Sequence, residues 1–247
     1  MDQIKTVIFD LDNTLYNYDV CDEAGKKAVA SYMKKRFGME ETEAMMRIQK
    51  QYDIQYASMN PQNAAVHSRL IRYQMIVEDL KKPLFPHVQA MTEAYWNTFY
   101  DQMVEEDGIT DVLKILHLYG VEVAIGTNMT TWVQYEKLKR LKLGMYIDSM
   151  ITSEEAEAEK PTPEFFDFCM KRLGRKKEEC LFIGDSLVHD YEGATAYGMP
   201  TVWYAGAAIR KGKKEEPDHP FPAERINSYK DCLRENGLQM GEYLFSW

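Results

Sequence analysis

Short apolar segments recur along this chain, and most of them are followed directly by a polar residue. Their length and their content of Val, Ile and Phe are typical of strands buried in a parallel sheet. Segments with apolar residues at helical spacing alternate with them, at residues 110–119, 132–143 and 163–173. The pattern predicts an α/β fold with a doubly wound parallel sheet. The predicted strands are residues 6–9, 121–126, 180–184 and 201–204, with 150–152 as a weaker fifth.

Residues 19–103 interrupt this alternation, because they contain helical patterns and no convincing strand. A crossover between parallel strands usually needs one helix, and this segment is far longer than that. We therefore predict a helical domain, residues 17–103, inserted after the first strand of a sheet domain formed by residues 1–16 and 104–247. The helices expected in the insertion are residues 22–37, 40–56, 64–80 and 87–103.

The composition narrows the range of partners. The chain carries a formal net charge of −9 and has a sequence pI of about 5.2. Because an acidic surface repels nucleic-acid backbones and anionic lipids, we expect no nucleic acid and no membrane as partner. The four cysteines lack metal-ligand spacing, and we predict neither a signal segment nor a membrane span. These observations predict a cytoplasmic protein with reduced thiols, and they predict no particular oligomeric state.

The first predicted strand runs directly into the segment Asp10-Leu11-Asp12. Ligands of open α/β sheets bind at the carboxyl ends of the strands, which is where these carboxylates would lie. Residues two apart on an extended chain point to the same side, roughly 6–7 Å apart. Asp10 can therefore act as nucleophile and metal ligand while Asp12 transfers a proton. Two carboxylates this close imply a divalent cation, and oxygen ligands favour Mg²⁺.

Two further clusters supply groups that suit a phosphoryl substrate. Thr127 and Asn128 follow the second strand, where a hydroxyl and a backbone N–H can bind a phosphoryl oxygen beside the start of a helix. Lys160 lies just before another helix start, with Thr162 as N-cap and Pro163 in the first turn. A lysine fixed in this place can neutralise charge on transferring phosphoryl oxygens.

The predicted strand at residues 180–184 also ends in a polar cluster. Gly184 permits a tight exit from the strand, and Asp185 is placed to reach the same ion as the first aspartate. Asp190 can bind that ion through water, or it can orient the lysine. We interpret His189 as a loop histidine beside the site.

These motifs, in this order and in these strand contexts, resemble those of the haloacid dehalogenase superfamily of phosphohydrolases. The motifs are Asp-Leu-Asp-Asn-Thr at 10–14, Thr-Asn at 127–128, Lys-Pro at 160–161 and Gly-Asp-Ser-x-x-x-Asp at 184–190. The resemblance covers the chain from about Thr6 to Leu233. It implies a Rossmann-like core with an inserted helical cap of the C1 type, which would close over the site and contact the substrate. This agrees with the helical insertion inferred from the residues alone.

The resemblance also implies a role for each matched residue. Asp10 would form an aspartyl-phosphate, and Asp12 would protonate the leaving oxygen and then activate water. Asp10, the main-chain carbonyl of Asp12 and Asp185 would hold Mg²⁺. The phosphoryl group would be bound by Thr127, the amide of Asn128 and Lys160. The supporting residues would be Thr14, Ser186 and Asp190.

Other members of the superfamily catalyse different reactions. Dehalogenases and phosphonatases lack a carboxylate at the position of Asp12, so this residue argues against both. A sugar-phosphate mutase would retain Asp12 and stays an alternative, as does a catalytically silent regulatory protein with the same fold. A silent protein has no physical need for the full set of charged residues. We therefore expect a Mg²⁺-dependent phosphomonoester hydrolase.

The expected substrate is a small phosphorylated metabolite, with a nucleoside monophosphate ahead of a sugar phosphate. Residues 10–16 are similar to the first motif of pyrimidine 5′-nucleotidases in the superfamily, which is a weaker resemblance. Tyr16 and Tyr18 lie where the chain leaves the core for the cap. Either ring can stack on a base or pack at the hinge, and both interpretations stay open at this point.

Overall fold

The computed structural model describes residues 4–213, 222 and 224–233. The chain divides into two compact units, which we call the sheet unit (residues 1–17 and 104–247) and the helical unit (residues 18–103). The end of the predicted sheet domain, residues 234–247, lies outside the described residues. The catalytic role of the sheet unit and the cap role of the helical unit remain predictions.

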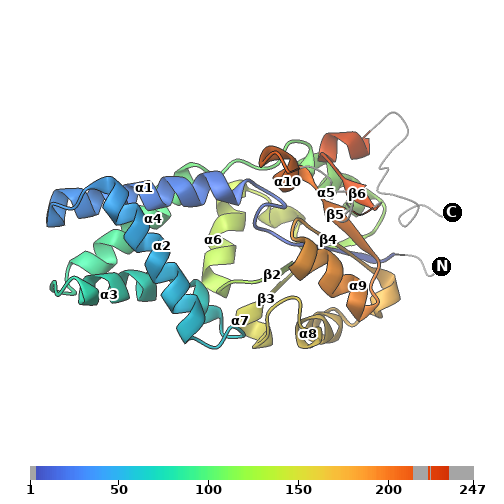
Figure 1. Ribbon diagram of the computed structural model, residues 1–247. Coiled ribbons are helices and arrows are strands. Elements are labelled where there is room, and N and C mark those ends of the chain that lie inside the picture. The colour runs from blue at the N-terminus through green and yellow to red at the C-terminus, as the bar shows by residue number, and fades with distance from the viewer. Residues whose placement is uncertain (1–3, 214–221, 223, 234–247) are drawn as a thin grey trace. The chain divides into compact units, whose positions relative to one another are not determined.

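The sheet unit is built on a parallel sheet in the strand order β3-β2-β1-β4-β5-β6 (Figure 1). This confirms the predicted α/β class and its parallel sheet. The predicted strand at residues 150–152, the weakest of the five, is the edge strand β3. The strand at the other edge, β6, was not predicted, because a strand of two residues has no recognisable periodicity. The strands are β1 (Thr6–Phe9), β2 (Glu122–Thr127), β3 (Ser149–Thr152), β4 (Cys180–Gly184), β5 (Thr201–Tyr204) and β6 (Arg225–Ile226).

One face of the sheet is covered by an apolar cluster. Ile8 of β1 lies opposite both Ala124 of β2 and Phe182 of β4, so their side chains point to the same face. Phe165 and Phe166 pack against this face and are fully buried. Burial of each phenylalanine stabilises the fold by roughly 1.5–3 kcal/mol. The packing holds β1, β2 and β4 together and so fixes where their carboxyl ends lie.

The longer helices of the sheet unit begin close to their predicted positions. The helix predicted at 163–173 ends at Gly174, which has a φ of 62°, as a glycine cap allows. The helix predicted to end before Gly144 ends earlier, because Lys142 adopts the left-handed conformation with a φ of 60°. The helices are α5 (Ile109–Leu118), α6 (Thr131–Leu141), η2 (Gly144–Tyr146), α7 (Ser153–Ala156), α8 (Pro163–Leu173), η3 (Lys177–Glu179), η4 (Leu187–Glu192), α9 (Gly193–Tyr197), α10 (Gly206–Arg210) and η5 (Tyr229–Leu233).

The helical unit follows the predicted pattern with one exception. The segment predicted as a single helix at 64–80 is a 3₁₀ turn and a separate helix, because the Ser68 hydroxyl accepts a hydrogen bond from the Ile71 N–H and starts a new helix there. None of the described helices is long and apolar enough to cross a membrane. The elements are α1 (Tyr18–Phe37), α2 (Glu41–Ser58), η1 (Ala64–His67), α3 (Arg69–Asp79) and α4 (His87–Asp101).

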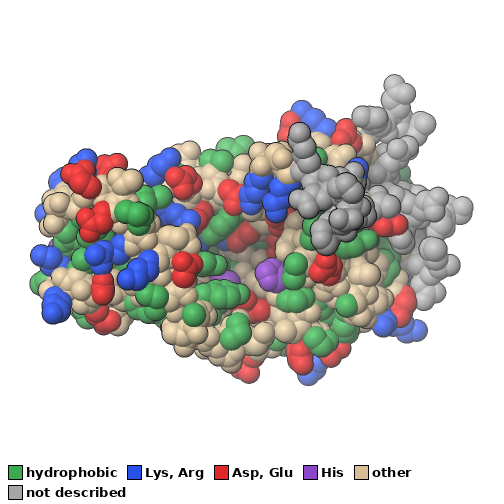
Figure 2. Space-filling model, in the orientation of Figure 1, with side chains coloured by type: hydrophobic (Ala, Val, Ile, Leu, Met, Phe, Trp, Pro, Cys, Tyr) green, Lys and Arg blue, Asp and Glu red, His purple; other side chains and the backbone are tan. Residues whose placement is uncertain are grey.

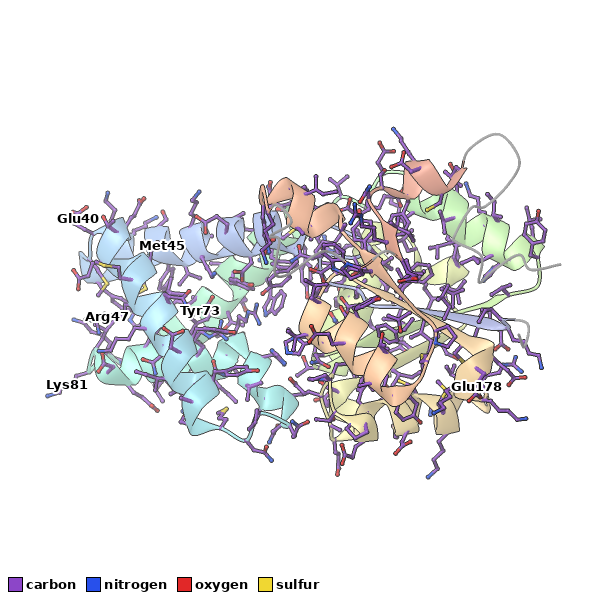
Figure 3. All side chains as sticks on the ribbon, turned by 45° about the vertical axis from the view of Figure 1, so that its right-hand side comes forward. Glu40, Met45, Arg47, Tyr73, Lys81 and Glu178 are labelled. Carbon is purple, nitrogen blue, oxygen red and sulfur yellow. The ribbon has the colours of Figure 1, made fainter. Side chains whose placement is uncertain are left out.

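The interior of the helical unit combines apolar and polar side chains. Val29, Met33 and Ile76 are fully buried, as the helical spacing of apolar residues predicts. Tyr73 points between the helices, whereas Arg47 and Lys81 lie on the outside of the unit (Figure 3). Acidic and basic side chains intermix over the face of the molecule shown in Figure 2.

A short antiparallel bridge joins the two segments of the sheet unit that flank the helical insertion. Tyr16 and Glu105 form an antiparallel bridge, and the backbone N–H of Glu106 donates to the carbonyl oxygen of Leu15 at 2.8 Å. The residues that precede and follow the insertion are therefore hydrogen-bonded neighbours.

Candidate active site

Three adjacent strands of the sheet unit end in the predicted site residues. β2, β1 and β4 are neighbours, and their carboxyl ends carry Thr127, Asp10 and Asp185. The backbone N–H of Asp10 donates to the carbonyl oxygen of Ile183 at 2.8 Å, so the strand pairing continues into the aspartate itself. The carboxylate is thus held by the sheet rather than by a free loop.

Lys160 lies between two of the predicted aspartates. Its Nζ is 2.7 Å from Oδ1 of Asp10, 2.6 Å from Oδ1 of Asp190 and 2.9 Å from the carbonyl oxygen of Gly126. Its side chain is only 3% exposed. Burial alone lowers the pKa of Lys160, but the two carboxylates outweigh burial and raise it, so the ammonium stays charged. Of the two roles open to Asp190, orienting the lysine is the one this arrangement supports.

The carboxylates of Asp10, Asp185 and Asp190 form a cluster whose candidate ligand oxygens all lie within 4.8 Å of one another. Burial raises the pKa of Asp10 to about 7, although the charge of Lys160 opposes the rise. Burial, together with the charges of Asp10 and Asp190, raises the pKa of Asp185 well above its ordinary value. Three carboxylates face the single ammonium of Lys160, so negative charge is in excess in this cluster. Buried oxygen ligands in excess of positive charge fit a hard divalent cation.

Gly184 has a different role from the predicted one. Its φ is not in the positive range, so the strand exit does not require a glycine. A Cβ at this position would lie 2.3 Å from Oδ2 of Asp190. The absence of a side chain therefore makes room for the carboxylate that contacts Lys160.

Asp12 has close partners that the sequence pattern does not indicate. Nζ of Lys137 lies 2.7 Å from each carboxylate oxygen of Asp12, and the Tyr16 hydroxyl donates to its Oδ1 at 2.6 Å. The side chain of Lys137 is fully buried. These two contacts fix the orientation of the proposed acid and base.

The same contacts favour hinge packing over base stacking for Tyr16. Its side chain is fully buried, and its hydroxyl is bound to Asp12. A ring without an exposed face cannot stack on a base, so its contacts favour packing. Tyr18 belongs to the helical unit, where its hydroxyl donates to Asp22 at 3.2 Å and its ring packs edge-on against Phe99 at 5.6 Å. These contacts likewise favour a structural role for Tyr18.

Thr127 and Asn128 are each held by a neighbouring segment. The Gln134 amide donates to the Thr127 hydroxyl oxygen at 2.7 Å, which leaves the hydroxyl proton free to be donated to a phosphoryl oxygen. The side-chain amide of Asn128 donates to the Lys160 carbonyl oxygen at 3.0 Å, and its oxygen accepts from the Lys160 N–H at 2.9 Å. Asn128 therefore fixes the backbone of Lys160.

The supporting residues lie beside the carboxylate cluster. The Thr14 hydroxyl accepts from the Asp185 N–H at 3.0 Å and is 3.4 Å from Oδ2 of Asp10. The Ser186 N–H donates to Oδ2 of Asp190 at 2.9 Å. His189 is exposed, and its backbone N–H donates to the Ser186 hydroxyl at 3.1 Å, as expected for a loop histidine. Thr162 takes the N-cap position of α8, but its hydroxyl donates to the Glu159 carbonyl oxygen instead of capping the helix.

Two contributors to the site, Gln134 and Lys137, were not predicted. Both project from the buried face of α6, where Leu138 and Leu141 also lie. A sequence signal was present, because these polar residues share the helical spacing of the apolar ones. Polar side chains on a buried face need partners, and here the partners are Thr127 and Asp12.

We expect Gln134→Leu to lower kcat/KM by about threefold to tenfold, the effect of losing one neutral hydrogen bond. The Thr127 hydroxyl would lose the donor that orients its proton toward the phosphoryl group. The inhibition constant of inorganic phosphate should rise by a similar factor. Gln74→Leu, which removes an exposed amide bonded to Glu78, is the matched control. Unchanged phosphate inhibition in Gln134→Leu would show that Gln134 does not orient Thr127.

The sequence of this chain is similar to that of a known protein family. Residues 7–204 match the model described as haloacid dehalogenase-like hydrolase, a range that contains every motif from Asp10 to Asp190. The chain belongs to the haloacid dehalogenase-like hydrolase family. The match also runs through the helical unit, so the insertion is part of the family pattern.

Individual relatives in this family support the same assignment. A ribulose-1,5-bisphosphate 5-phosphatase of Halopiger xanaduensis is 33% identical over 222 residues, which are 86% of this chain and 93% of the relative. The pyrimidine 5′-nucleotidase PynA of Streptococcus pneumoniae is 27% identical, covering 95% of this chain and 97% of the relative. The solved structure of a HAD phosphatase from Thermococcus onnurineus has a TM-score of 0.69 at 22% identity, with 94% of this chain and 97% of that chain covered.

These findings confirm the predicted family, the Rossmann-like α/β fold and the enzyme class. The chain is a phosphatase of the haloacid dehalogenase-like family, and small phosphorylated metabolites are the class of substrate that its relatives support. The roles of individual site residues remain predictions, as does the cytoplasmic location.

Proposed function

We propose that this protein is a Mg²⁺-dependent phosphomonoester hydrolase that works through an aspartyl-phosphate on Asp10. The observation that carries the proposal is the buried carboxylate of Asp10, which is held by Lys160 next to Asp185 and Asp190. Phosphoryl transfer requires a fixed nucleophile, a cationic side chain and oxygen ligands for a metal ion, and this cluster offers all three.

In the proposed reaction, an oxygen of Asp10 attacks the phosphorus and the bond to the leaving oxygen breaks. Asp12 donates a proton to that leaving oxygen. The phosphoryl oxygens are bound by the Thr127 hydroxyl, the Asn128 N–H and the Lys160 ammonium. Asp12 then takes a proton from water, which attacks the aspartyl-phosphate, releases phosphate and restores the Asp10 carboxylate.

The proposed cation site consists of Asp10 and Asp185, with the main-chain carbonyl of Asp12 as the predicted third ligand. Asp190 lies within reach of the same cation, although it also contacts Lys160. When bound, Mg²⁺ would offset the repulsion between the carboxylates and the anionic phosphoryl group.

For the substrate, we propose a sugar phosphate ahead of a nucleoside monophosphate, which reverses the order expected from the short motif. The proposal is supported by the relative named for a sugar bisphosphate, which is 33% identical, whereas the relative named for nucleotides is 27% identical. The burial of Tyr16, one of the two candidates for base stacking, also supports this order. A nucleoside monophosphate stays the second candidate.

We expect phosphate release from p-nitrophenyl phosphate and from ribulose 5-phosphate, with slower release from uridine monophosphate. Chelation with EDTA should stop the release, and added Mg²⁺ should restore it, because the carboxylate cluster requires a cation. A malachite green assay of free phosphate provides the measurement. Conversion of a sugar phosphate to an isomer without phosphate release would favour the mutase alternative. Turnover that persists after chelation would contradict the proposal.

A further inference from the structure

Trp203 is a buried tryptophan of the sheet unit whose side chain reaches the proposed cation site. It lies in β5 and pairs with Gly184, the last residue of β4, so the pairing between these two strands ends there. The indole Nε1–H extends one residue further and donates to the main-chain carbonyl oxygen of Asp185 at 2.7 Å. Trp203 therefore holds the backbone of a proposed metal ligand just beyond the end of the strand pairing.

The backbone of Asp185 is held on both sides of its Cα atom. Its N–H donates to the Thr14 hydroxyl at 3.0 Å, and its carbonyl oxygen accepts the hydrogen bond from Trp203. Both partners are themselves enclosed, since Thr14 is fully buried and Trp203 is 1% exposed. Two buried side chains from other segments of the sheet unit thus fix the backbone that carries the Asp185 carboxylate.

The indole ring of Trp203 has little freedom to move. Its strand, β5, is an interior strand that pairs with β4 on one side and β6 on the other. The apolar cluster around the ring contains Ala205, Ala208, Leu187 and Tyr191. A buried indole N–H needs an acceptor, and the packing directs this one to the Asp185 carbonyl oxygen. The hydrogen bond is therefore a fixed feature of the folded sheet unit.

Rigid placement of a carboxylate ligand affects the choice of cation. Mg²⁺ requires nearly ideal octahedral geometry with oxygens at about 2.0–2.1 Å, whereas Ca²⁺ accepts irregular geometry and oxygens at about 2.3–2.6 Å. A small displacement of one ligand oxygen therefore weakens the binding of Mg²⁺ more than the binding of Ca²⁺. The residues that hold a ligand in place can thus determine which of the two cations is preferred.

We propose that Trp203 is a positioning residue that gives the cation site its preference for Mg²⁺ over Ca²⁺ by fixing the backbone of Asp185. Trp203 acts through Asp185, because an indole N–H is a donor only and cannot coordinate a cation. This inference rests on the proposed Mg²⁺-dependent function and adds to it a residue that sets the metal selectivity.

The test measures cation binding to the full-length protein without substrate, by isothermal titration calorimetry with MgCl₂ and with CaCl₂. The wild type should bind Mg²⁺ more tightly than Ca²⁺. Trp203→Phe keeps an aromatic ring but has no N–H. In this variant the dissociation constant of Mg²⁺ should rise about threefold to tenfold, the effect of losing one neutral hydrogen bond. The dissociation constant of Ca²⁺ should change by less than about twofold, because Ca²⁺ tolerates a displaced ligand.

Control variants separate positioning from stability. Trp132→Phe makes the same replacement at a residue that is 75% exposed, and it should change neither dissociation constant. Val202→Ala removes buried apolar contacts from the same strand but leaves the indole N–H, so it should lower the Tm and preserve the ratio of the two constants. Replacement of Trp203 by 3-benzothienylalanine, which has sulfur in place of the N–H and nearly the same shape, should reproduce the effect of Trp203→Phe.

An unchanged ratio of the two dissociation constants in the 3-benzothienylalanine variant would overturn the inference, as would a wild type without preference for Mg²⁺. Asp185→Asn should weaken Mg²⁺ binding strongly, and unchanged binding in that variant would place the ion elsewhere and also overturn the inference. Mg²⁺-stimulated release of phosphate would leave the proposed function standing in each of these cases. No binding of Mg²⁺ to the wild type, together with turnover that persists in EDTA, would contradict the proposed function and the inference with it.

Discussion

Replacing Asp10 with Asn is expected to lower kcat on p-nitrophenyl phosphate by at least about four orders of magnitude. An amide oxygen has the shape of the carboxylate but cannot act as the nucleophile. Asp111→Asn is the matched control, since Asp111 lies on the surface in a pair with Lys114. Rapid-quench trapping of a phosphorylated protein should succeed with the wild type and fail with Asp10→Asn. Near-wild-type turnover by Asp10→Asn would rule out the proposed nucleophile.

The same substitution should stabilise the protein without metal. The pKa of Asp10 is raised to about 7 in the folded protein, whereas its ordinary value is 3.8. The folded state then holds a proton that the unfolded chain has lost, so this residue makes stability fall as pH rises from about 4 to about 7. Asn cannot titrate. In EDTA, Asp10→Asn should therefore unfold at a higher temperature than the wild type at pH 8, and the difference should shrink toward pH 4.

The second large effect is expected for Asp12→Asn, with kcat reduced about 10²–10⁴-fold. Asn cannot donate the proton that the leaving oxygen needs. The reduction in kcat should therefore be greater for an alkyl phosphate than for p-nitrophenyl phosphate, whose leaving group needs little protonation. Asn keeps the hydrogen bond from Tyr16 but loses the ion pair with Lys137.

A second variant separates the loss of the proton donor from the loss of the ion pair with Lys137. Lys137→Met removes the ion pair and leaves the Asp12 carboxylate in place. It should reduce turnover less than Asp12→Asn, with little difference between alkyl and aryl substrates. Equal losses for both substrates in Asp12→Asn would remove Asp12 from the role of acid.

Much of the site was predictable because it depends on strand ends. Asp10, Thr127 and Asp185 each follow a short apolar run, and the carboxyl ends of adjacent parallel strands meet at one edge of a sheet. The local pattern is enough to place them together. It also predicts the helix start before which Lys160 lies.

The remaining features depend on contacts between distant parts of the chain. The helical spacing of Lys137 indicates that it is buried, but Lys137 and Asp12 are 125 residues apart and nothing in the sequence identifies them as partners. Arginines in a helix are usually expected at the solvent-exposed surface. Arg69 and Arg72 are buried because α3 packs against other helices. The orientation of Tyr16 was open for the same reason: hinge packing and substrate stacking leave identical sequence signals.

The bridge between Tyr16 and Glu105 has a consequence for how this protein can be rebuilt. Bridged residues on antiparallel segments lie about 4.5–5.5 Å apart, a gap that a turn of a few residues can close. The segment between them can therefore be removed or exchanged without pulling β1 away from its neighbours. We expect a chimaera that carries the insertion of another family member to keep the proposed chemistry of the sheet unit, and a change in its preferred metabolite would support the predicted cap role of the helical unit.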